Sequence, residues 1–212
     1  VQVKTDNRFT KALKGIKTDA KVTVLRGGKA LCTSSGEVLF TEYGLSGPAV
    51  FEVSRYASTG KDLEISLDLM PEYGEEEVAA ILFELRISGA GRSCEDFLTG
   101  ILNKRLGQTV LKYAEVALSQ PVSALKDGQL YKIARAVKNF SFAVTGTTGF
   151  ENAQVTAGGI RTSEFDSRTL ESRICPGLFA AGEVLDVDGR CGGYNLQWAW
   201  SSGRLAGRLG NV

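Results

Sequence analysis

Two glycine-containing motifs in the last third of the 212-residue sequence have the residue types of a ligand-binding loop. In the first, Gly177-Leu178-Phe179-Ala180-Ala181-Gly182-Glu183, a short apolar run ends in a glycine and a carboxylate. We expect residues 178–183 to form a buried strand that ends at the carboxyl edge of a sheet, where ligands bind in open α/β proteins. The Glu183 carboxylate could accept hydrogen bonds from a sugar hydroxyl there, with a helix cap or a surface acid as the alternative.

The second motif, Gly192-Gly193-Tyr194-Asn195, is expected to open a helix that runs toward the end of the chain. Free backbone N–H groups and the positive end of the helix dipole would face a ligand at this turn. A flavin carbonyl that gains negative charge on reduction would suit such a position. Because the helix carries Trp198 and Trp200 among small residues, we expect it to be buried; a plain core helix is the alternative explanation.

Four further features are candidates for ligand binding or catalysis. Gly158 and Gly159 follow an expected strand over 153–156 and would let backbone approach a flat ligand, or simply form a tight turn. Cys191 precedes the helix start, a position that can lower the pKa of a thiol. It could therefore be redox-active beside a flavin, and a small packing residue is the alternative. The loop 41–48 could line a substrate pocket or be a structural turn. Three carboxylates lie close together without the pattern of a calcium loop, so no metal site is expected: Glu183, Asp186 and Asp188.

The composition excludes several classes of chemistry. The absence of histidine excludes Ser-His-Asp and Cys-His catalysis and histidine metal sites within this chain. The four cysteines show no CxxC spacing, which favours a reducing compartment. The net charge is +1 without a run of Lys or Arg, so we expect no nucleic-acid or membrane partner. No secretory signal and no apolar run of roughly 18 residues is present.

The elements that position these motifs follow from the periodicity of apolar residues. Alternation predicts strands over 21–26, 30–34, 37–40, 63–69 and 140–144. Helices are expected from Pro48 to about Tyr56, after the acids 75–77, after a capping box of Ser93 and Asp96, and over 130–137. A change of character near residues 145–150 indicates a domain boundary. The chain begins with Val1 and its only methionine is Met70, which favours a processed or excised piece over a complete domain that has lost a tag.

Four segments in the same order resemble the BaiN/YhiN-like family of NAD(P)/FAD-dependent oxidoreductases. They are Leu39–Pro48, Ala153–Gly159, Pro176–Gly189 and Gly192–Gly203. The resemblance implies an α/β fold in which an α+β domain of strands and helices, residues 1–146, is inserted into a Rossmann-type FAD-binding domain. Residues 147–212 would be the C-terminal segment of that FAD domain. The GxGxxG motif of the family's N-terminal half is not present in this sequence.

The same resemblance implies which residues hold FAD. The ribityl–pyrophosphate side would face Gly182, Glu183 and Asp186. The isoalloxazine would be approached by Gly193, Tyr194, Asn195 and Leu196, with Gly158 and Gly159 close by, and Gly192 is a further expected cofactor-binding residue. Catalytic residues are not assigned, and the weak candidates are Glu42, Tyr43 and Cys191. Glu42 stands where the family often has histidine, so it would have to replace that residue in substrate protonation or the chemistry would differ.

The expected function is therefore a portion of a cytoplasmic FAD-dependent oxidoreductase. FAD would pass two electrons from a donor such as NAD(P)H to a small organic acceptor or oxygen. The alternative is a non-catalytic substrate- or partner-binding module taken from a flavoprotein. Without the N-terminal Rossmann half, the isolated chain is expected to be inactive. We also expect it to form a homodimer or to be locally disordered, because four apolar side chains would be exposed or repacked: Leu178, Phe179, Trp198 and Trp200.

Overall fold

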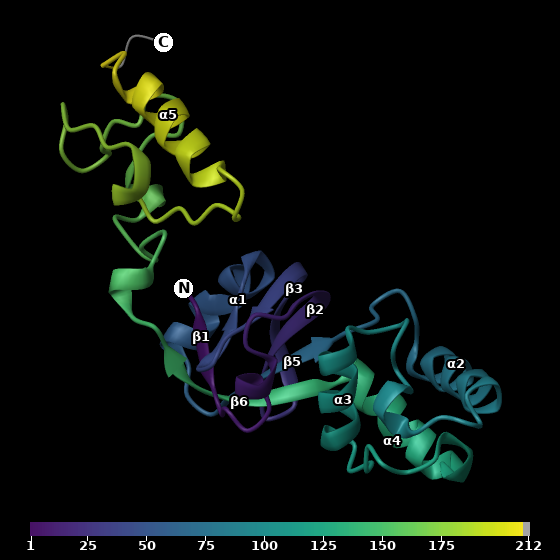
Figure 1. Ribbon diagram of the computed structural model, residues 1–212. Helices are drawn as coiled ribbons and strands as arrows, with labels where there is room; N and C mark the ends of the chain where they lie inside the picture. Colours follow the sequence, from purple (N-terminus) through teal and green to yellow (C-terminus); the bar gives the residue numbers. More distant parts are fainter. Residues whose placement is uncertain (210–212) are drawn as a thin grey trace. The chain divides into compact units, whose positions relative to one another are not determined.

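The computed structural model describes residues 1–209 and divides the chain into two compact units, Val1–Thr148 and Gly149–Val212. Figure 1 shows the elements of each unit in sequence colours. We describe each unit by itself. Together they form a mixed α+β protein, in which almost all of the regular structure belongs to the first unit.

The first unit is built on a closed antiparallel barrel with the strand order β1-β4-β3-β2-β5-β6. The strands are β1 (Val3–Thr5), β2 (Lys17–Arg26), β3 (Lys29–Phe40), β4 (Gly44–Ser46), β5 (Leu63–Asp68) and β6 (Phe140–Thr147). Inward-facing apolar residues alternate along the strands, as in the fully buried pair Val22 and Val24. Closure pairs β1 with both β4 and β6, so the sheet has no open edge.

Two expectations for these strands were wrong. Residues 29–40 form one continuous strand rather than two short ones, because Gly36 keeps its pairing with Ala20 across the Ser-Gly step. Strand β6 does not end at residue 144 as expected but continues to Thr147, because β1 pairs with Gly146 and Thr147. Helix α1 (Pro48–Thr59) begins at Pro48 as expected.

A helical segment connects β5 to β6. It contains α2 (Glu75–Ser88), α3 (Lys104–Tyr113) and α4 (Asp127–Lys138), with short 3-10 helices at Cys94–Asp96 and Val122–Ala124. The expected capping box of Ser93 and Asp96 is wrong: Ser93 makes no side-chain cap, and the segment closes as one 3-10 turn. The periodicity of apolar residues does not predict helix α3. Its N-cap is Asn103, whose side-chain oxygen accepts from the Arg105 amide.

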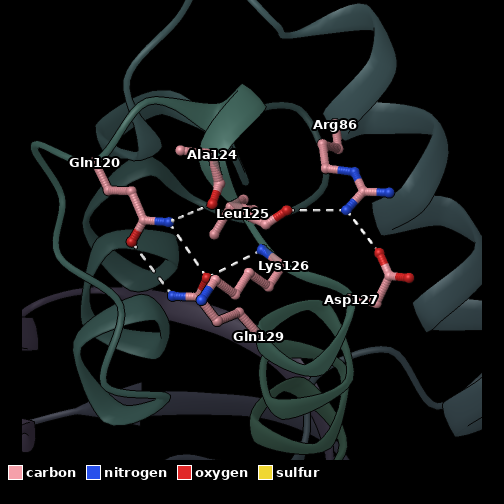
Figure 2. A network of polar contacts seen from close by, with 7 residues as sticks. All are labelled: Arg86, Gln120, Ala124, Leu125, Lys126, Asp127 and Gln129. Carbon is pink, nitrogen blue, oxygen red and sulfur yellow. Dashed lines mark hydrogen bonds and ion pairs between the residues drawn. The ribbon is translucent and has the colours of Figure 1, made fainter.

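A network of polar contacts fixes the turn that precedes α4 (Figure 2). The guanidinium of Arg86 on α2 donates to the Leu125 carbonyl at 2.9 Å and to the Asp127 carboxylate at 2.8 Å. On the other side, the amides of Gln120 and Gln129 contact each other at 3.3 Å, and Gln129 accepts from the Lys126 amide. The network therefore ties α2 to the start of α4.

The second unit has little regular structure within its described residues 149–209. It consists of short 3-10 turns and one helix, α5 (Tyr194–Ala206), over a small core made of Phe165, Leu170, Leu185 and Ala206. The strands expected over 153–156 and 178–183 are wrong, since only isolated bridges form, such as Glu171 with Phe179. Strands need partners along their length, and the described part of this unit offers single bridges only.

Candidate functional site

In the second unit, the loop 156–160 packs against residues 182–186 at Gly159. The Ile160 amide donates to the Val184 carbonyl at 2.8 Å, and the Asp186 amide donates to the Ile160 carbonyl at 2.9 Å. A Cβ on Gly159 would lie 2.6 Å from the Val184 carbonyl oxygen, whereas one on Gly158 would meet nothing within 4 Å. Gly159 is thus needed for close approach of backbone, and Gly158 borders open space.

Gly182 joins the same loop to helix α5. Its amide donates to the Ser202 hydroxyl at 2.9 Å, and its carbonyl accepts from the Trp198 indole at 3.0 Å. Because Ser202 is buried and Trp198 packs on the small core, these bonds hold residues 182–186 beside the helix. Sequence reasoning did not assign Ser202 or Trp198 to this role, although both lie in the motif quoted for the final helix.

The start of α5 is shaped by Gly193, which adopts the left-handed conformation at the N-cap with φ of 94°. The Asn195 side chain then turns back and contacts Gly189 twice, accepting from its amide at 2.8 Å and donating to its carbonyl at 3.0 Å. No acidic residue lies in the first turn of α5 and no side chain caps it. Tyr194 and Leu196 are 62% and 60% exposed.

The predicted carboxylates occupy different environments. The Glu183 side chain accepts a hydrogen bond from the Thr156 amide, so it connects the two glycine loops. Asp186 is exposed, and its backbone rather than its carboxylate makes the contact with Ile160. Cys191 is half-buried just before α5, and none of the four cysteines forms a disulfide. No group of residues that could hold a metal ion occurs among the described residues.

The structure therefore places the predicted cofactor residues of the second unit in the first turn of α5 and in the loops 156–160 and 182–189. The loop 182–189 contacts α5 at two places, with Gly182 beside Trp198 and Ser202 and Gly189 beside Asn195. The catalytic candidates Glu42 and Tyr43 belong to the first unit. Glu42 forms an exposed ion pair with the Lys14 ammonium at 2.7 Å, and this contact lowers the pKa of the Glu42 carboxyl. The Tyr43 hydroxyl donates to the Gln2 side-chain oxygen at 2.7 Å.

Apolar surface is concentrated in the second unit. Ten of the fifteen large apolar side chains exposed in the described chain lie there: Phe150, Val155, Ile160, Ile174, Leu178, Val184, Tyr194, Leu196, Trp200 and Leu209. The expectation that α5 is buried is wrong, since Trp200 is 66% exposed. Leu178 is also exposed, while Phe179 and Trp198 pack against the small core. No helix of the described residues is long and apolar enough to cross a membrane.

The chain is similar to a known protein family and to characterised members of it. Residues 1–155 match the model of the HI0933-like protein barrel and H2TH domain. The chain is 43% identical over 204 residues to the 3-dehydro-bile acid delta(4,6)-reductase of Clostridium scindens. The aligned region covers 94% of this chain and 50% of that protein.

Two ribosomal RNA dihydrouridine synthases are also similar. The protein from Haemophilus influenzae is 33% identical, and the alignment covers 92% of this chain and 46% of that protein. The protein from Escherichia coli is 37% identical, and the alignment covers 78% of this chain and 40% of that protein. The chain spans about half the length of the curated relatives it matches. The family match covers residues 1–155, the barrel and the helical segment together, and agrees with the resemblance of the sequence motifs. The chain belongs to the HI0933-like, BaiN/YhiN-like family.

Proposed function

We propose that this chain is part of an FAD-dependent oxidoreductase and that its second unit supplies one side of the flavin site. The observation that carries the proposal is the start of α5, where a left-handed Gly193 opens a 13-residue helix without an acidic residue in its first turn. The first N–H groups of a helix have no acceptor within the helix, and the dipole there favours negative charge. This end suits a group that becomes more negative when it is reduced.

The residues present fit a flavin in shape as well as in charge. Gly158 and Gly193 have positive φ, and a Cβ on either would meet nothing within 4 Å, so a flat ligand can approach the backbone. In our proposal the residues 192–196 and Gly158 lie near the isoalloxazine. The ribityl–pyrophosphate side lies near Gly182, Glu183 and Asp186, with Gly159 holding the two loops together.

The names of the relatives point to the class of reaction. One is a reductase of a 3-dehydro-bile acid at its 4 and 6 double bonds, and two form dihydrouridine, which is uridine with one double bond reduced. Both substrates have carbon–carbon double bonds conjugated with a carbonyl group. We propose the same class of acceptor here, with NAD(P)H as the donor; bound FAD would supply hydride transfer.

Reduction of such a double bond also consumes a proton, and the first unit contains two candidates for its donor. The Lys14 ammonium keeps the Glu42 carboxyl ionised by lowering its pKa, so Glu42 is a poor acid at neutral pH. The Tyr43 hydroxyl is a hydrogen-bond donor, and it donates to the Gln2 side-chain oxygen. Of the two, we propose Tyr43 as the proton donor. In this proposal the first unit is the substrate domain.

The test uses the native polypeptide that contains this chain, purified and examined for the visible absorbance of bound flavin. Gly193→Asp and Gly193→Asn then form a matched pair, because the two side chains have the same shape and both tolerate left-handed backbone. We expect the Asp variant to bind FAD roughly fivefold more weakly than the Asn variant, since its charge occupies the positive helix end. Equal affinity of the two variants would refute the placement of flavin at α5.

A native polypeptide that binds no flavin at all would refute the oxidoreductase proposal. It would favour the alternative of a non-catalytic module that binds a substrate or partner. If flavin is bound, consumption of NAD(P)H with an enone steroid and with a uridine-containing RNA identifies the acceptor class.

A further inference from the structure

Strand β2 extends beyond its pairing with β5 at one end of the barrel. It pairs with β3 along its full length, but with β5 only from Lys21, which lies opposite Asp68. Strand β5 ends at Asp68, and Pro71, which has no N–H group, follows it closely. The barrel has no edge strand, but residues 17–20 therefore have a neighbouring strand on one side only.

The backbone groups of Lys17 and Asp19 face this unpaired side. Successive residues of an antiparallel strand direct their N–H and C=O groups toward opposite neighbours. The Ile16 carbonyl accepts from the Phe40 amide at 2.9 Å, so residue 16 faces β3. Lys17 and Asp19, which lie one and three residues further along, face away from β3.

The segment that follows β5 does not take up these groups. If β5 continued in the same register, Met70 would lie opposite Asp19, but the Met70 amide donates to the Asp68 carboxylate at 3.1 Å. The Asp19 carbonyl accepts one contact of 3.3 Å, from the adjacent Thr18 hydroxyl. Within residues 1–209, the amides of Lys17 and Asp19 have no acceptor, and both residues are exposed.

A hollow of about 380 Å³ lies beside this strand end. Residues 17–19 form one wall, and the rest is formed by the segments 69–72 and 100–103, which follow β5 and precede α3. Three lining side chains are apolar and belong to the barrel core or pack against it: Leu69, Ile101 and Leu102. A ligand in the hollow would meet unpaired backbone on one side and apolar surface on the other.

Carboxylates outnumber cations around the hollow. Lys17, Asp19 and Glu72 line it, and the Lys17 ammonium is already paired with the Glu37 carboxylate at 3.0 Å. Lys21, the next residue on the same face of β2, does not line the hollow. Among the ion pairs of the described residues, none includes Asp19 or Glu72. A cationic group beside Asp19 is therefore favoured.

We propose that this end of β2 binds an extended segment of a partner protein with a basic side chain opposite Asp19. A strand added to an exposed sheet edge gains affinity from main-chain hydrogen bonds and specificity from alternate side chains. In antiparallel addition, the residues opposite Lys17 and Asp19 would each exchange hydrogen bonds with β2. The residue between them, opposite Thr18, would lie on the face of β2 that carries the buried Ala20 and Val22, so an apolar side chain suits it.

The proposal goes beyond the proposed oxidoreductase function and does not require flavin, because every residue of the hollow belongs to the first unit. Amide hydrogen exchange of the full chain tests its premise. The amides of Lys17 and Asp19 should exchange at least roughly tenfold faster than those of Thr18 and Ala20, which face β3. Equal protection of the two pairs would refute the unpaired strand end.

Binding is measured by the anisotropy of the peptide fluorescein-Val-Lys-Val-Thr-Val-amide, in which the lysine is placed opposite Asp19. N-methylation of this lysine removes an N–H group that faces β2, whereas N-methylation of the central valine alters one that faces away. We expect the first to weaken binding roughly fivefold more than the second. Glutamate in place of the lysine should also weaken binding roughly fivefold, because it lies opposite Asp19.

Asp19→Pro and Asp19→Ala form a matched pair on the protein. Both remove the carboxylate, but only proline also removes the N–H group, and strands tolerate proline where the N–H faces away from the ladder. The proline variant should bind the peptide roughly fivefold more weakly than the alanine variant. Circular dichroism checks folding, and if the proline variant is unfolded the N-methylated peptides decide.

Three results would overturn the proposal. The first is the absence of saturable binding of the peptide, and the second is an equal effect of the two N-methyl groups. The third is protection of the Lys17 and Asp19 amides in the native polypeptide before any peptide is added, because a segment of that polypeptide would then occupy the strand end. Slower exchange of these two amides on addition of the peptide would support it.

Discussion

Two adjacent glycines with different surroundings allow a direct test of how the second unit is held together. Gly158 and Gly159 both have positive φ, at 93° and 154°, so alanine is strained at either position. Only at Gly159 would the new methyl group meet backbone, with the Val184 oxygen at 2.6 Å and the Asp186 nitrogen at 2.8 Å. Gly158→Ala is therefore the control for backbone strain alone.

The expected difference in stability between Gly159→Ala and Gly158→Ala follows from the hydrogen bonds that must break in the first variant only. To admit a methyl group at Gly159, residues 184–186 must move away, which removes the hydrogen bonds from Ile160 to Val184 and from Asp186 to Ile160. A backbone hydrogen bond contributes about 1 kcal/mol net, so Gly159→Ala should cost about 2 kcal/mol more than Gly158→Ala. That energy corresponds to roughly a 30-fold change in a local opening equilibrium.

Amide hydrogen exchange measures this opening at the residues concerned. We expect protection of the Ile160 and Asp186 amides to fall roughly 30-fold further in Gly159→Ala than in Gly158→Ala. The amides of the barrel in the first unit should be unaffected in both variants. If the two variants lose the same protection, the close approach of the loops at Gly159 does not stabilise this unit and the reasoning is refuted.

Two further predictions concern ion pairs of the first unit. Lys138→Met should lower the free energy of unfolding by about 3 kcal/mol in urea titrations, because the Lys138–Asp68 pair is largely buried and the Asp68 carboxylate would lose its cationic partner. Lys132→Met, which removes an exposed pair, should change it by less than about 0.5 kcal/mol; similar losses in both would contradict this. Second, the pKa of Glu42 is lowered in the folded chain and that of Lys14 is raised, so their pair stabilises the fold between the ordinary pKa values of 4.5 and 10.5. Its contribution is lost as pH falls through the Glu42 pKa or rises through the Lys14 pKa, and NMR titration of Lys14→Gln should show the Glu42 pKa moving up; an unchanged pKa would count against the ion pair.

Local sequence was sufficient for elements whose signals lie within a few residues. Pro48 marks the start of α1, the three acids at 75–77 begin α2, and alternation identifies β5. The double glycine before Tyr194 likewise marks the start of α5, because glycine adopts the left-handed N-cap conformation without steric cost. These features depend on backbone conformation and short-range contacts, which a short stretch of sequence encodes.

The tertiary structure decided the features that depend on a partner distant in the sequence. Barrel closure requires β1 to pair with β4 and β6, and no pattern within β1 indicates either partner. An apolar run such as 178–183 becomes a strand only where neighbouring strands accept its hydrogen bonds, and it remains irregular here. The Arg105 guanidinium on α3 donates to the Ala12 carbonyl, so helix α3 and residues 10–13 become neighbours only after folding. The sequence alone therefore determined the family and the local turns, whereas long-range contacts determined the barrel, the irregular second unit and the contact between α3 and residues 10–13.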